Sequence, residues 1–143
     1  MINLSFELFY FTDKIRKIKL TTGTILFADS SESIQIQICQ NRDCCQTKTL
    51  PGHYARGSTI SFSGSTLGEC ENKKIDANNE AIEITLKTVT SDGWRGTLTT
   101  IHTTNQENPY ECIITRWIDK GFFAVGPEKY ETTCRLSKYI FEV

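Results

Sequence analysis

Residues 33–46, SIQIQICQNRDCCQ, indicate the fold class of this chain. Isoleucine and glutamine alternate from position 34 to position 38, which is the period of a strand that buries one face and exposes the other. Three cysteines follow the alternating run, namely Cys39, Cys44 and Cys45. The stretch therefore predicts a strand that is cross-linked by disulfide in an all-β protein.

Similar short runs, rich in β-formers and separated by turn residues, recur along the chain. The eight predicted strands are residues 15–22, 34–39, 45–50, 59–63, 82–89, 97–103, 110–118 and 139–143. Periodicity typical of a helix is hard to find over ten or more residues. This spacing favours an antiparallel sandwich or barrel with little helix.

Length and charge limit the classes of protein that fit. A chain of 143 residues suits one domain, and no repeat or linker divides it, so we expect residues 1–143 to be a single unit. The 16 Lys and Arg residues against 17 Asp and Glu give a net charge of −1. Nucleic acid is therefore excluded as the expected partner.

The six cysteines indicate an oxidising compartment. A zinc site is the alternative, but no C-x-x-C pair occurs, and His53 and His102 are isolated. Disulfides are favoured, and the protein is expected to be extracellular. Residues 1–11 lack a basic start and a small-residue cleavage site, so no signal peptide is evident.

The alternating strand also suggests how the cysteines pair, among fifteen connectivities. If the isoleucines face the core, Cys39 lies on the outer face, opposite Cys44 across the loop 40–43. Cys45 then points into the core. The predicted pairs are Cys39 with Cys44, Cys45 with Cys70, and Cys112 with Cys134.

The order of several motifs resembles the PLAT (LH2) domain of lipoxygenases and pancreatic lipases. These motifs are Thr21-Thr22-Gly23, FADSS at 27–31, the strand 33–39 and SDGW at 91–94. More specifically, IQICQNRDCCQTKTL, LGEC at 67–70 and the segment 112–117 look like cysteine-bearing extracellular PLAT-like modules of invertebrate animals. The similarity spans residues 18–119, which leaves 120–143 as a C-terminal extension.

The resemblance implies a fold and a class of function. The implied fold is an antiparallel eight-stranded β-sandwich whose end loops contact a lipid or membrane surface, or a partner protein. It implies no catalysis and, in some members, bound calcium. The expected function is thus a non-catalytic extracellular binding module.

Calcium ligands are carried over from the family only in part. Calcium-binding members offer an Asp where this chain has Ser31, so the ligands here would be Asp29, Glu32 and Asp92. Calcium requires six to eight oxygen ligands, and few acids are available. The alternative, which we favour, is that Asp29 and Asp92 form turns.

Aromatic residues give further candidates for contact with a lipid or partner. Trp94 opens a strand and is expected in the core rather than at a membrane. Tyr54 lies beside a Pro-Gly turn, and Phe122 and Phe123 are adjacent, so that one of the two faces outward in an extended strand. That phenylalanine either contacts the ligand or is covered by residues 14–20.

The sequence also bears on two other functions. An enzyme is not expected, because neither histidine sits in a recognisable motif. The glutamate pairs Glu69 with Glu71 and Glu128 with Glu131 suit a solvated surface rather than a catalytic pair. The second hypothesis is a secreted structural or effector protein, such as a matrix component, inhibitor or carbohydrate binder. Its recognition segment would be residues 50–68, whose Ser- and Gly-rich composition also suits an ordinary surface hairpin.

Overall fold

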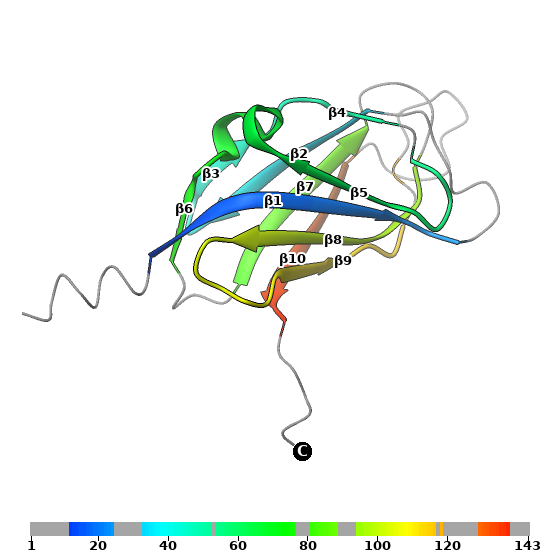
Figure 1. Ribbon diagram of the computed structural model, residues 1–143. Coiled ribbons are helices and arrows are strands. Elements are labelled where there is room, and N and C mark those ends of the chain that lie inside the picture. The colour runs from blue at the N-terminus through cyan, green and yellow to red at the C-terminus, as the bar shows by residue number, and fades with distance from the viewer. Residues whose placement is uncertain are drawn as a thin grey trace, which may run out of the picture.

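The computed structural model describes residues 12–24, 33–52, 54–76, 81–88, 94–116, 118 and 129–137. These residues form ten strands and one 3-10 helix (Figure 1). The strands are β1 (Thr12–Thr22), β2 (Ser33–Gln40), β3 (Asp43–Gln46), β4 (Leu50–Pro51), β5 (Thr59–Ser63), β6 (Lys74–Asp76), β7 (Ala81–Thr88), β8 (Gly96–Thr103), β9 (Tyr110–Ile113) and β10 (Lys129–Leu136). The helix, η1, spans Gly64–Cys70.

The strands form one curled antiparallel sheet. Their order is β3-β2-β7-β10-β9-β8-β1-β5, with β4 paired to β2 and β6 to β1. Strand β10 pairs with β7 from Lys129 to Arg135, but with β9 only at Arg135 and Leu136. At this thin junction the sheet turns over, so that the halves β3-β2-β7-β10 and β9-β8-β1-β5 face each other across the core (Figure 1).

Alternating strands supply the core from both halves. In β2 and β7 the inward residues are Ile34, Ile36, Ile38, Ile82, Ile84 and Leu86, all buried. In β1 the inward residues Ile18 and Leu20 are fully buried. Burying a side chain of this size contributes about 1.5–3 kcal/mol. The predicted all-β antiparallel fold is confirmed, with ten strands in the described residues in place of eight.

Polar contacts join the two halves along the edge formed by β3. The Gln40 side-chain amide donates to the Asp76 carbonyl (3.1 Å), and its oxygen accepts from the Asp76 N–H (2.7 Å). The Gln40 side chain of β2 thus bonds both backbone groups of Asp76 in β6, as a neighbouring strand would. The Lys73 ammonium also lies 2.6 Å from Asp43 in an ion pair.

Three disulfides cross-link the sheet, and their pairs are those the sequence predicts. Cys39–Cys44 joins β2 to β3, Cys45–Cys70 joins β3 to η1, and Cys112–Cys134 joins β9 to β10. The turn between Cys39 and Cys44 is tight because Asn41 and Arg42 have φ values of 53° and 68°, the conformation that suits a two-residue hairpin. The Cys112–Cys134 bridge lies where hydrogen bonding between strands is sparsest.

The C-terminal segment differs from the sequence expectation. Residues 129–136, within the stretch assigned to an extension, form β10 in the middle of the sheet. The run predicted at 110–118 ends as a strand at Ile113, and Ile118 only bridges Trp94. The strand predicted at 139–143 lies outside the described residues.

Candidate functional site

One end of the sandwich gathers the long connections that the sequence marks as candidate binding loops. Strands β1, β7 and β9 end there, and β2, β8 and β10 begin there, at the right of Figure 1. We call this the loop end. The connections between these strands, residues 23–32, 89–95 and 114–128, all leave from it. The antiparallel order therefore brings together strand ends that are far apart in the sequence.

A buried aromatic pair forms the base of the loop end. Trp94 is fully buried, and its indole N–H donates to the Thr22 hydroxyl at 2.9 Å. Its ring centroid lies 5.7 Å from that of Tyr54. A Cβ at Gly96 would lie 2.2 Å from the Trp94 ring, so only glycine fits there. The expectation that Trp94 belongs to the core is confirmed.

Tyr54 was expected as an exposed contact for lipid or partner, and this is wrong. The side chain is fully buried, and its hydroxyl donates to the Leu50 carbonyl. The cause is Trp94, which offers an aromatic partner that local sequence does not reveal. Pairing of this kind adds about 0.5–1.5 kcal/mol to the burial itself. Tyr54 is therefore part of the buried aromatic pair at the loop end.

Backbone hydrogen bonds tie the strand ends to this base. The Gly23 N–H donates to the Arg95 carbonyl (2.8 Å), and the Gly57 N–H contacts the Thr22 and Gly23 carbonyls at 3.2 and 3.1 Å. The Arg95 guanidinium donates to the Gly96 and Ile114 carbonyls. Loops that carry function are commonly held by a rigid base of this kind.

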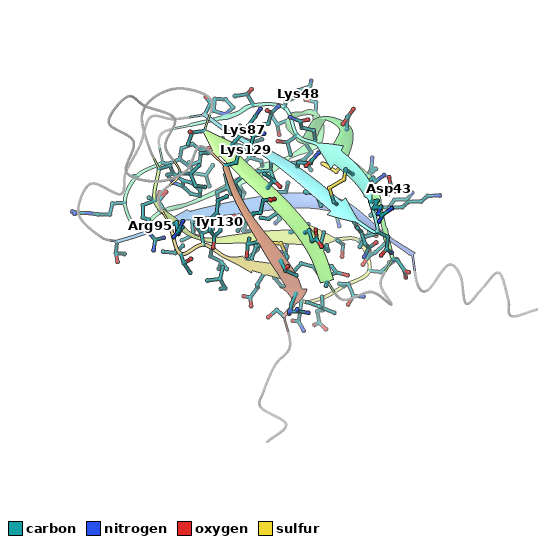
Figure 2. The ribbon with its side chains drawn as sticks, turned by 180° about the vertical axis from the view of Figure 1, so that it is seen from behind. Asp43, Lys48, Lys87, Arg95, Lys129 and Tyr130 are labelled. Carbon is teal, nitrogen blue, oxygen red and sulfur yellow. A yellow bond between two sulfur atoms is a disulfide. The ribbon has the colours of Figure 1, made fainter. Side chains whose placement is uncertain are left out.

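A hollow of about 690 Å³ and one of about 650 Å³ mark the outer face of the half that contains β2, β7 and β10. The larger hollow surrounds the Cys39–Cys44 disulfide. The smaller hollow lies toward the loop end and is lined by Gln37, Thr85, Arg116, Lys129, Tyr130 and Glu131. Viewed from behind, Lys87, Lys129, Tyr130 and Arg95 lie toward one end and Asp43 at the other (Figure 2).

The residues predicted to bind calcium or lipid fall largely outside the described residues. The structure does not describe Asp29, Glu32, Asp92, Phe122 or Phe123. Within the described ranges no group of three or more His, Cys, Asp or Glu side chains is placed to hold a metal ion. All six cysteines are used in disulfides.

His102 lies on the outer face of β8, away from the loop end. Partial burial lowers its pKa from 6.5, and the charges of Lys19 and Lys17 lower it further. Its ring nitrogen is 3.3 Å from the Thr100 hydroxyl. His102 therefore lies on a polar strand face beside Thr100.

No protein-family model matches the sequence, and no curated protein sequence matches it. Solved structures do match. Coral 8R-lipoxygenase, described as activated by calcium through a C2-like domain, has a TM-score of 0.52 and 16% identity over 87% of this chain. A lipoxygenase variant in complex with arachidonate has a TM-score of 0.53 and 16% identity, also over 87% of this chain. Alpha toxin from Clostridium absonum has a TM-score of 0.52 and 15% identity over 89% of this chain.

These likenesses establish the fold. The chain spans about a sixth of the two lipoxygenases, 16% of the arachidonate complex and 17% of the coral enzyme, and 32% of the toxin. The likeness is consistent with the PLAT-type sandwich that the sequence motifs resemble. Among the described residues no helix is long and apolar enough to cross a membrane.

Sequence reasoning missed the basic residues beside the smaller hollow. Lys87 and Lys129 are directly opposite each other in the pairing of β7 with β10. No strand is predicted at residues 129–136, so no local pattern brings the two lysines together. Which residues of β7 and β10 stand opposite each other also depends on the strand register. The register can be predicted only when the buried positions of both strands are recognised.

Proposed function

We propose that this protein is a non-catalytic extracellular binding module that engages a lipid or membrane surface through its loop end. The observation that carries the proposal is that β1, β7 and β9 end, and β2, β8 and β10 begin, at the end of the sandwich that holds the Trp94–Tyr54 aromatic pair. A surface that many loops share suits contact with an extended ligand such as a membrane.

The likeness to solved structures supports this choice of ligand. Coral 8R-lipoxygenase is described with calcium activation through a C2-like domain, and another neighbour is a complex with arachidonate. The part of those lipoxygenases that this chain matches is small, which supports a module without its own catalysis. A partner protein that contacts the same loops is the other outcome of the test below.

The disulfides support a place outside the cell. Cysteines that pair across strands persist in oxidising compartments, and all six cysteines of this chain are paired. We therefore propose secretion. Calcium, if it contributes, is expected to bind among Asp29, Glu32 and Asp92, each of which lies in a connection at the loop end.

Co-sedimentation with phospholipid vesicles, with calcium and with a chelator, tests the function. Binding under either condition is the expected result. Replacing Phe122 and Phe123 by alanine is expected to weaken binding, because apolar area that enters the interface is lost. Ile113→Ala removes an exposed apolar side chain from the outer face of β9 and is the matched control. Absence of sedimentation under both conditions would contradict a lipid ligand and leave a protein partner.

A further inference from the structure

Two lysines face each other on the outer face of the sheet next to the loop end. Lys87 of β7 and Lys129 of β10 are direct cross-strand partners, and side chains in such positions start about 4.5–5.5 Å apart at Cβ. Like charges placed directly opposite destabilise a sheet. Within the described residues neither lysine has a carboxylate at ion-pair distance. An anion bound between them would relieve the repulsion.

Arg116 adds a third positive charge on the same side. Strand β10 separates from the chain that follows β9, and Tyr130 spans the gap. The Tyr130 hydroxyl accepts from the Thr115 N–H (3.3 Å) and lies 3.0 Å from the Thr115 hydroxyl. This contact fixes the residue before Arg116 next to the start of β10. Arg116 and Lys129 thereby line the same hollow of about 650 Å³.

The rest of the hollow suits an oxygen-rich ligand. Gln37 and Thr85 are adjacent on β2 and β7 and offer an amide and a hydroxyl donor. Glu131 supplies one negative charge beside Thr85. It lies beyond ion-pair distance from the basic side chains. Lys129 and Arg116 thus line the hollow together with two neutral donors and one carboxylate, and Lys87 lies next to it, opposite Lys129. The site is positive and open to solvent.

We propose that Lys87, Lys129 and Arg116 form a calcium-independent site for the phosphate group of an anionic lipid headgroup. Lysine binds phosphate as a point charge, and arginine binds it through its planar fork. The inference rests on the proposed function and adds a headgroup preference to it. It also places part of the contact on the outer face of β7 and β10, so that the sandwich lies tilted at the membrane.

Vesicle binding in the presence of a calcium chelator tests the site. The probes are vesicles of phosphatidylcholine alone and of phosphatidylcholine with phosphatidylserine. The full chain is expected to prefer the anionic vesicles, and added salt is expected to weaken binding by screening. Replacing both Lys87 and Lys129 by glutamine is expected to weaken binding about 30-fold, given the usual contribution of each basic residue near an anionic surface.

The chain offers a matched control on its opposite half. Lys17 and Lys19 lie on the outer face of β1, so Lys17→Gln with Lys19→Gln removes the same charge elsewhere. This control is expected to lose much less affinity. An equal loss in both double variants would overturn the site, because binding would then follow net charge. Binding that requires calcium would also overturn it while leaving the proposed function intact, whereas no binding to any vesicle would contradict both.

Two further measurements distinguish the proposed site from misfolding of the variants and from binding of a soluble anion. In Lys129→Glu the new carboxylate faces Lys87, so the free energy of unfolding is expected to rise while vesicle binding falls; misfolding would lower both. NMR titration with phosphoserine and with inorganic phosphate is expected to shift the amides of Lys87 and Lys129 weakly. Tight binding of either soluble anion without vesicle binding would contradict a lipid source.

Discussion

Asp13 has a buried carboxylate that organises the end of the sandwich opposite the loop end. Its side chain is 1% exposed. It accepts from the Thr103 hydroxyl at 2.7 Å, and from the Thr104 hydroxyl and the Asn105 N–H at 2.6 Å each. Because the acceptor is charged, each bond is worth more than an ordinary hydrogen bond. The start of β1 is thereby fixed to the turn between β8 and β9.

Asp13→Ala is expected to lower the free energy of unfolding by about 2–4 kcal/mol, because the buried Thr103 hydroxyl loses its charged acceptor and the hydrogen bonds from Thr104 and Asn105 are lost as well. Asp13→Asn keeps one acceptor oxygen and is expected to cost less. Urea unfolding followed by circular dichroism measures both variants. A loss below about 1 kcal/mol in Asp13→Ala would mean that water replaces the carboxylate.

His102 makes the stability of the fold sensitive to acid. Its pKa is lowered in the folded protein by partial burial, then by Lys19 and Lys17. The unfolded chain then binds a proton more readily, so stability is full above pH 6.5 and falls as the pH drops toward the lower folded pKa. NMR titration of the ring protons checks the direction. In Lys19→Gln the pKa is expected to move back up, and an unchanged value would contradict the role of that charge.

At the scale of elements, the junction between β9 and β10 depends on a disulfide. The strands pair at only two positions, and Cys112–Cys134 closes a loop with a sequence separation of 22 residues. Replacing both cysteines by alanine is expected to cost about 3 kcal/mol on the chain-entropy model. Thermal unfolding of the double variant measures the loss.

The Cys39–Cys44 pair is the matched control for that disulfide. It closes a separation of only 5 residues between strands that already pair directly. Removing it is expected to cost about 2 kcal/mol or less on the same model. If its removal costs more than removal of Cys112–Cys134, loop closure is not the main source of stabilisation.

The elements also differ in how well sequence predicts them. Strand β2 was predictable because isoleucines fill its inward positions, and the same alternation placed Cys39 opposite Cys44. Strand β10 was not, because Thr132 stands opposite the buried Ile84 and interrupts the apolar pattern. The predicted exposure of Tyr54 is wrong for another reason. The side chain packs against Trp94, which is distant in sequence. Local patterns predict a strand, but long-range partners decide which surfaces remain exposed.

At the scale of the whole molecule, the sheet order interleaves the two ends of the chain. The C-terminal strand β10 lies between β7 and β9, and the N-terminal strand β1 lies between β8 and β5. Neither half of the sandwich is complete without a strand from a distant part of the sequence. We therefore expect the described residues to unfold as one cooperative unit, as small single domains usually do.

Truncation after residue 119 tests this interdependence, since it removes β10 and leaves β7 and β9 without their shared neighbour. The shortened chain is expected to lose cooperative urea unfolding, because strand pairing then no longer joins the two halves of the sheet. It also leaves Cys112 without Cys134. The full chain with both cysteines replaced by alanine separates that effect, and is expected to keep a cooperative transition at lower stability. A cooperative transition in the truncated chain would contradict this prediction. It would show that the two halves of the sandwich fold together without residues 120–143, and therefore without β10.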